Sequence, residues 1–228
     1  MDTLVLPKVT LGVQQATSAG GTSSALQIVL ILTVLTLAPA IIIMMTSFTR
    51  IVVVLSFVRS ALATQQMPPN QVLIGLALFL SFFVMSPVVN DINQQAYQPF
   101  VQGKITQRQA LDRASVPIRR FMLRQTRDKD LALFTDMAGL EAPIDPDKLS
   151  LSLVIPAFTI SELKTAFQIG FVIFIPFLVI DMVVASTLMS MGMLMLPPMM
   201  ISLPFKIVLF VLADGWYLVV KSLVTSFH

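Results

Sequence analysis

The sequence has no cysteine, and its one histidine is His228, among 228 residues. Disulfides, thiolate catalysis and Cys/His metal sites are therefore excluded, and the interior of the chain offers no histidine base for a serine protease. Around Asp181 and Asp214 the GxGD pattern of intramembrane aspartyl proteases is also missing, and Gly20-Gly21 is not followed by the GK[ST] of a phosphate loop. We expect a protein that is not an enzyme and that binds no metal and no cofactor.

Charge is scarce as well. Charged residues make up 12% of the chain and hydrophobic residues 56%, and the mean hydropathy is +0.85. An ordinary soluble domain is about 25% charged, and one core could not hide so much apolar surface. The chain is therefore predicted to be membrane-associated. A net charge of +3 gives no sign of a nucleic-acid partner.

Long runs without charge divide the chain, which is predicted to be all-α, into four segments. These are an N-terminal extension (1–25), a first apolar helical hairpin (26–90), a charged helical insert (91–164) and a second apolar hairpin with a methionine-rich loop (165–228). The first hairpin should turn near Met67–Asn70, and its second span should end near Pro87 and Asn90. Residues 1–21 lack a signal-peptide pattern, so either a signal has been removed or the first span targets the chain.

Helix-start signals lie within and after the charged insert. Thr106 and Gln109 have the spacing of a capping box, and so do Thr159 and Glu162. The second pair predicts that a helix begins at Thr159 and leads into the second hairpin. A short helix over 130–138 should end at Gly139.

Six of the 14 methionines fall between Met189 and Met200. Met189, Met191, Met193 and Met195 occupy every second position, which would place them on one side of an extended segment. Irregular backbone at membrane depth survives only where it is buried in protein or lines a cavity. A ring of such loops, one per subunit, would form a deformable apolar constriction. The alternative is that these methionines only fill a membrane core, and composition leaves both possibilities open.

Asp181 and Lys206 are isolated charges in an apolar tract, which makes them candidates for a functional pair. In a symmetric hairpin their heights would differ by about 12 Å, so we expect the pair to form between neighbouring subunits. Glu162 and Lys164 are likewise expected to form ion pairs between subunits or helices. Structural pairing is favoured over a proton relay. The alternative function is a polytopic ion or solute transporter that uses Asp181 and Lys206 as its coupling site.

Long strings of the sequence closely resemble the FliP/SctR family of type III secretion export-gate proteins. The strings are Met44–Arg50, Pro68–Val72, Phe121–Arg127, Glu162–Phe171, Phe174–Phe177, Asp181–Ser186, Ile201–Lys206 and Asp214–Trp216. The resemblance begins near Leu26 and covers nearly all of the remaining chain. Phe121–Arg127 is more similar to the flagellar branch than to the virulence branch.

The resemblance implies a homo-oligomer, a pentamer in this family, that joins FliQ and FliR in a helical pore and meets FlhB and FlhA. It implies passage of unfolded flagellar subunits through that pore in the bacterial inner membrane, within the flagellar basal body, with the insert 91–164 on the periplasmic side. The pore gasket would be formed by Met189, Met191, Met193, Leu194 and Met195. Leu194 interrupts the methionine run that many members have, so the seal should tolerate any flexible apolar residue.

Overall fold

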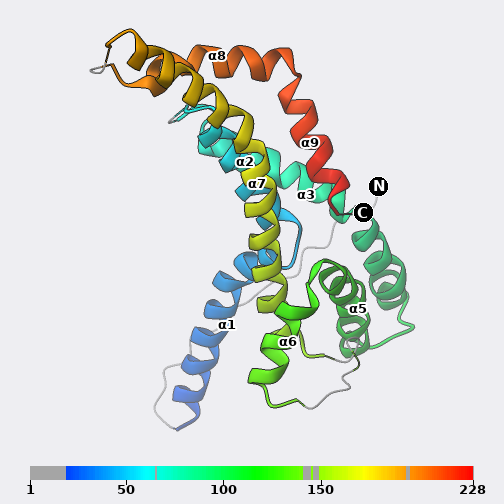
Figure 1. Ribbon diagram of the computed structural model, residues 1–228. Coiled ribbons are helices and arrows are strands. Elements are labelled where there is room, and N and C mark those ends of the chain that lie inside the picture. Colours follow the sequence, from blue (N-terminus) through cyan, green and yellow to red (C-terminus); the bar gives the residue numbers. More distant parts are fainter. Residues whose placement is uncertain (1–18, 65, 141–144, 146–148, 194–195, 228) are drawn as a thin grey trace, which may run out of the picture. The chain divides into compact units, whose positions relative to one another are not determined.

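The computed structural model describes residues 19–64, 66–140, 145, 149–193 and 196–227, and these residues form helices without any strand (Figure 1). The all-α prediction is therefore confirmed. The helices are α1 (Ala19–Met44), α2 (Phe48–Ala61), α3 (Asn70–Ile92), η1 (Asn93–Tyr97), α4 (Gln98–Val101), α5 (Gln107–Gln125), α6 (Asp128–Met137), α7 (Leu151–Ser190), α8 (Pro198–Leu212) and α9 (Gly215–Thr225). Contacts divide the chain into residues 1–41 and residues 42–228.

Most of α1 belongs to the first unit. Its described side chains are largely apolar and exposed, and it carries no acidic residue in its first turn and no basic residue in its last turn. A helix that is hydrophobic all round is suited to lipid or to the interior of a larger assembly.

The core of the second unit is built around α2. Ile51, Val54, Leu55 and Val58 are completely buried and pack with residues of α3, α7, α8 and α9. Their spacing of three and four residues forms one face of a helix. A smaller core joins α5 to the start of α7 through Met122, Leu149, Val154 and Phe158.

The contact between α2 and α7 depends on a glycine. A Cβ atom on Gly170 would lie 2.5 Å from Cγ of Phe57, which is closer than real Cβ contacts come. The Phe57 ring also packs edge-on against Phe167 of α7, with 5.2 Å between the ring centroids. Gly170 therefore allows α7 to approach α2 closely enough for the two helices to share a core.

The charged insert contains α5 and α6. Thr106 caps α5 as predicted, since its Oγ1 accepts a hydrogen bond from the Gln109 amide and Gln109 Oε1 accepts one from the Thr106 amide. Gly139 follows α6 with a φ of +66°, so the predicted end of that helix is confirmed.

The predicted helix start at Thr159 is wrong. Helix α7 begins at Leu151, where Ser150 is the N-cap and accepts a hydrogen bond from the Ser152 amide. Thr159 donates its hydroxyl to the Ile155 carbonyl one turn earlier, so it acts as an ordinary helical threonine. Burial of Val154 and Phe158 against α5 stabilises the turns that precede it. The predicted boundary between residues 164 and 165 consequently falls inside one continuous helix.

The second span of the first hairpin also continues further than predicted. Helix α3 passes through Pro87 and ends at Ile92, and it is followed without a break by the π-helical turn η1 and by α4. A proline inside a helix removes one backbone hydrogen bond but does not end the helix when packing holds both sides. The helical rod from Asn70 to Val101 is 32 residues long.

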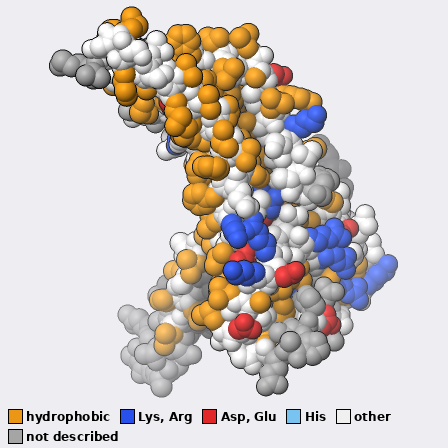
Figure 2. Space-filling view, viewed as in Figure 1, with side chains coloured by type: hydrophobic (Ala, Val, Ile, Leu, Met, Phe, Trp, Pro, Cys, Tyr) orange, Lys and Arg blue, Asp and Glu red, His pale blue; other side chains and the backbone are white. Residues whose placement is uncertain are grey.

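Among the described residues, two helical rods are long and apolar enough to cross a membrane, Asn70–Val101 and Leu151–Ser190. The count rises to four if the bent pairs α1 with α2 and α8 with α9 are each taken as one span. The predicted single return arm over 201–224 is broken, because α8 and α9 meet at 65° and Asp214 between them has a φ of +50°. Hydrophobic side chains cover the surface of the α7–α8 region in Figure 2.

Candidate functional site

The methionine-rich stretch forms the turn between α7 and α8, at the end of the hairpin (Figure 1). Helix α7 ends at Ser190, and Gly192 has a φ of +75°. The Gly192 amide donates to the Met189 carbonyl and the Met193 amide donates to the Leu188 carbonyl, each at 3.0 Å. This is a Schellman ending, in which a left-handed glycine closes the last carbonyls of a helix. The backbone at Gly192 and Met193 is therefore held by hydrogen bonds to α7, whereas the Met191 and Met193 side chains are exposed.

The described methionines of this turn point away from the core. Met189, Met191 and Met193 have exposed fractions of 61%, 69% and 41%. Met189 belongs to the last turn of α7, so the predicted extended segment does not begin there, and only residues beyond Ser190 leave the helix. Leu194 and Met195 lie outside the described residues.

Below the turn, an ion pair joins the two arms of the hairpin. Lys206 Nζ donates to Asp181 Oδ2 at 2.6 Å, and Ser202 Oγ donates to Asp181 Oδ1 at 2.5 Å. Lys206 and Ser202 are buried, whereas the Asp181 side chain is 28% exposed. Ser202 and Lys206 are four residues apart on α8, which places both on the same face toward α7. Both carboxylate oxygens of Asp181 are thus occupied within one chain.

The premise that kept Asp181 and Lys206 apart was a symmetric hairpin with helix on both sides up to the prolines, and it is wrong. Helix α7 already ends at Ser190, seven residues before Pro197. Asp181 lies nine residues before the end of α7 at Ser190, and Lys206 lies eight residues after the start of α8 at Pro198. At 1.5 Å per residue the two are nearly level. One chain can therefore close the pair that the sequence analysis assigned to neighbouring subunits.

Glu162 pairs with Arg50 of α2. The Arg50 Nε donates to Glu162 Oε2 at 2.9 Å, and its Nη2 also bonds Glu162 Oε1. Arg50 is 2% exposed and Glu162 is fully buried, so this bidentate pair lies inside the second unit. Lys164, two residues further along α7, is exposed and takes no part in it.

Arg50 also holds the end of the chain. Its Nη1 donates to the Ser226 carbonyl at 2.8 Å, and its Nη2 donates to Gln125 Oε1 at 2.9 Å. The Arg50 guanidinium carbon lies 3.9 Å from the centre of the Phe227 ring, and Gln125 Nε2 donates to the Phe227 carbonyl at 3.1 Å. We call Arg50, Gln125, Glu162, Ser226 and Phe227 the Arg50 node. It ties α2, α5, α7 and the turn after α9 together.

Sequence reasoning missed the Arg50 node. Arg50 resembles a charge at the edge of an apolar span, and 112 residues separate it from Glu162. A usable signal was the isolation of Glu162 at the start of the longest apolar tract, because a buried carboxylate needs a cationic partner. The sequence alone could not identify which of several arginines supplies it.

A related contact fixes the insert on α7. The buried Ser161 hydroxyl donates to Asp130 Oδ2 at 2.6 Å and accepts a hydrogen bond from the Arg127 amide at 3.1 Å. Arg127 Nη2 donates to Gln168 Oε1 at 2.5 Å. In the part of the chain that the structure describes, no three His, Cys, Asp or Glu side chains gather as a metal site would require. The arrangement is suited to bracing helices and to presenting apolar surface.

The hairpin also carries an apolar groove, formed by residues of both α7 and α8. Its cavity volume is about 580 Å³, and its lining is almost wholly apolar. The groove is lined by Val179, Ile180, Val183, Val184, Thr187, Leu188, Ile201, Phe205 and Leu209. An exposed apolar groove of this kind marks a surface that a partner or lipid covers.

Comparison with known proteins gives a consistent result. A sequence model described as the FliP family matches residues 31–223. The chain is 63% identical to the flagellar biosynthetic protein FliP of Bacillus subtilis (strain 168) over 205 residues, which cover 90% of this chain and 93% of that protein. It is 56% identical to the protein of the same name from Pectobacterium carotovorum subsp. carotovorum, and the match covers 95% of this chain and 84% of that protein. It is 46% identical to the protein of that name from Borreliella burgdorferi, and the match covers 92% of this chain and 85% of that protein.

Proposed function

The chain belongs to the FliP family, and from this premise we propose that it is a pore-forming core subunit of the flagellar protein export gate. As a flagellar biosynthetic protein it is a component of the flagellar export apparatus. In the proposed role, several copies join FliQ and FliR, meet FlhB and FlhA, and conduct unfolded flagellar subunits across the inner membrane. The insert 91–164 would face the periplasm.

The observation that supports this proposal is the braced hairpin of α7 and α8. Its interior is closed by the pair of Asp181 and Lys206, while the apolar side chains outside are left uncovered. Phe171 and Met182 of α7, for example, are 65% and 64% exposed. A rigid hairpin with an apolar exterior and a flexible apolar tip is suited to packing beside copies of itself around a conduit.

The same hairpin argues against the transporter alternative. A coupling site must change its protonation or its ligand during each cycle, so its carboxylate has to be accessible. The Asp181 side chain is 28% exposed, but each of its two oxygens already accepts a hydrogen bond from a buried side chain of α8. We infer that Asp181 and Lys206 hold the register of the hairpin.

The gasket is tested by replacing Met191, Met193 and Met195 with alanine together. The complex purified with the FliQ and FliR homologues should keep its native mass, far above the 25.1 kDa of one chain. Vesicles that contain it should leak ions faster, because three flexible thioethers no longer fill the constriction. The control replaces Met67 and Met137, which are 73% and 75% exposed and lie outside both the turn and the exterior of the hairpin. Unchanged leakage in the triple variant would contradict the gasket, and a monomer as the sole species would contradict the pore.

A further inference from the structure

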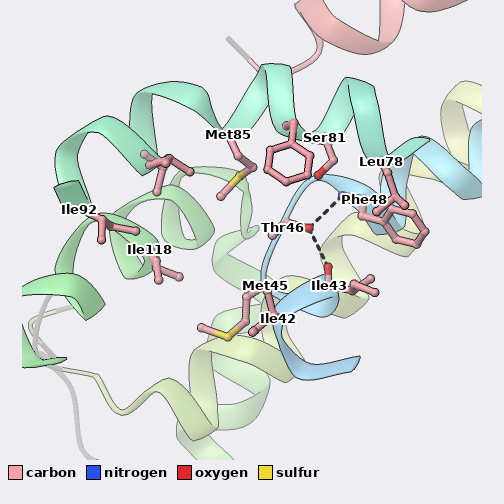
Figure 3. A pocket seen from close by; sticks show the side chains of 13 residues that line it. Ile42, Ile43, Met45, Thr46, Phe48, Leu78, Ser81, Met85, Ile92 and Ile118 are labelled. Atoms are coloured by element: carbon pink, nitrogen blue, oxygen red, sulfur yellow. Dashed lines mark hydrogen bonds between the residues drawn. The ribbon is translucent and has the colours of Figure 1, made fainter. Parts of the chain in front are cut away.

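Two neighbouring pockets lie against α3 in the second unit. The first is almost wholly apolar and has a volume of about 300 Å³ (Figure 3). It is lined by Ile42, Ile43, Met45, Thr46, Phe48, Leu78, Ser81, Phe82, Met85, Val88, Val89, Ile92 and Ile118. In Figure 3 its labelled side chains extend along α3 from Leu78 and Phe48 at one end to Ile92 and Ile118 at the other. Ile92 follows Leu78 by fourteen residues on α3, so this stretch of helix along the pocket is about 21 Å long.

The second pocket adjoins the first, and its lining is about half polar and half apolar. Its volume is about 450 Å³, and Asp91, Arg120, Arg124 and Gln125 are among its lining residues. Val88 lines both pockets. Successive residues of the same helices also divide between them, with Asp91 and Ile92 on α3 and Pro117 and Ile118 on α5. The apolar pocket therefore opens beside a half-polar one at the level of Val88.

The charge at the polar end is positive. Arg120 and Arg124 are one turn apart on α5, so their guanidinium groups lie on one face of that helix. Both are exposed, and neither forms an ion pair with a residue that the structure describes. Asp91 is the one carboxylate among the lining residues of this pocket, which leaves an excess of one positive charge. Helix α5 as a whole carries five arginines and one aspartate.

We propose that the two pockets together form a binding site for an anionic phospholipid. One acyl chain lies in the apolar pocket along α3, and the phosphate of the headgroup lies beside Arg120 and Arg124. The pocket is longer than one leaflet of the hydrocarbon core is thick, about 15 Å, so it can enclose most of a chain. Guanidinium groups bind phosphate oxygens in a bidentate manner, and basic pockets between membrane helices are suited to anionic headgroups. Contact with an annular zwitterionic lipid would not need the two arginines.

The headgroup end is tested on the full chain solubilised in detergent. Retained lipid is counted by native mass spectrometry after addition of phosphatidylglycerol or of phosphatidylcholine with the same acyl chains. We expect at least roughly tenfold preference for phosphatidylglycerol in the unaltered chain, and a loss of affinity of roughly thirtyfold in Arg120→Gln/Arg124→Gln. Asp91→Asn should increase the preference, because it removes the opposing carboxylate. The control Arg108→Gln/Arg113→Gln removes the same charge from the same helix outside both pockets and should change affinity by less than about twofold.

The acyl-chain end needs a separate variant. Val89 lines the apolar pocket and is half exposed, so Val89→Trp fills the pocket without disturbing the core. It should reduce the retention of both lipids, whereas Phe83→Trp, on an exposed position of α3 outside both pockets, should not.

Three results would overturn the proposal. Equal retention of the two lipids by the unaltered chain would show that no headgroup is recognised. Equal losses of phosphatidylglycerol affinity in the two arginine double variants would show that only the net charge of α5 matters. A fall in oligomer mass in Val89→Trp with an unchanged lipid count would assign the apolar pocket to a neighbouring protein chain. None of these readouts depends on export, so failure here leaves the proposed function separately testable.

Discussion

At the scale of single residues, one ion pair joins helices far apart in the sequence and a second joins the two arms of one hairpin. Arg50 and Glu162 join α2 to α7, and Asp181 and Lys206 join α7 to α8. A buried charge without its partner is strongly unfavourable in either water-soluble or membrane proteins. Each pair therefore specifies which helices meet and in which register.

The Arg50 node predicts a large effect of Glu162→Ala. The substitution leaves the Arg50 guanidinium buried without its carboxylate, which should lower the free energy of unfolding by about 3–5 kcal/mol. Thermal unfolding of the purified protein in detergent measures the effect. Lys164→Ala is the matched control, because Lys164 is exposed on the same helix and should change stability by less than about 0.5 kcal/mol. Similar losses for both variants would contradict the role given to the node.

The second pair separates a structural role from a coupling role. Asp181→Leu should cost about 3 kcal/mol, because it strands the buried Lys206. The double variant Asp181→Leu/Lys206→Met should recover most of that stability, since apolar replacement of a whole buried pair is often neutral. If the pair only sets the hairpin register, the double variant also restores motility to cells that lack their own copy. If the double variant is stable but the cells that carry it are not motile, the result would favour a role in ion coupling.

The sequence could single out these residues but could not pair all of them. Asp181 and Lys206 are recognisable because each interrupts an apolar tract, and Glu162 because it lies just before the longest one. Their partners depend on where helices end, and the end of α7 at Ser190, seven residues before Pro197, was enough to change the expected register by several ångströms.

At the scale of elements, local signals predicted helix starts correctly only where tertiary contacts agreed with them. The capping box at Thr106 is formed, because α4 ends at Val101 and Gly103, with a φ of +68°, interrupts the helical path before α5. The same spacing at Thr159 is overridden by burial of Val154 and Phe158 on the N-terminal side. Packing against a distant helix stabilises a turn by more than a cap does, and the sequence does not show which distant helix is near.

The close approach of α2 and α7 predicts that Gly170→Ala is destabilising. Alanine normally favours a helix over glycine by about 1 kcal/mol, but here its Cβ would meet the base of the Phe57 ring. We expect a net loss of about 1–3 kcal/mol. Gly75→Ala on α3 is the control, because no atom lies within 4 Å of its added Cβ, and it should be neutral or stabilising. Denaturant unfolding of both variants decides the matter, and Phe57→Leu should rescue Gly170→Ala.

At the scale of the whole molecule, much of the apolar surface remains uncovered. The 18-residue window of α7 that is apolar enough to span a membrane is only 11% buried. Composition alone predicted that this surface exists, because 56% of the residues are hydrophobic. It could not predict which faces are covered by the chain itself and which await lipid or other subunits.

A charge on the exposed face of α7 should therefore disrupt assembly while the chain stays folded. Phe171→Asp is expected to lower the mass of the complex purified with the FliQ and FliR homologues, because an unpaired carboxylate cannot enter an apolar interface. Leu111→Asp is the control, since Leu111 is equally exposed, at 66% against 65%, but lies on the charged insert. An unchanged mass for Phe171→Asp would place this face against lipid.

The closed backbone at Gly192 bears on how quickly a methionine seal could respond. Because the final carbonyls of α7 already have their amide partners, the thioether groups of Met189, Met191 and Met193 can change rotamer without breaking a main-chain hydrogen bond. Exposed rotamer changes take picoseconds to nanoseconds, whereas loop rearrangements extend toward microseconds. A collar built in this way would follow the contour of a translocating polypeptide residue by residue, and would recover its resting shape before the next segment arrived.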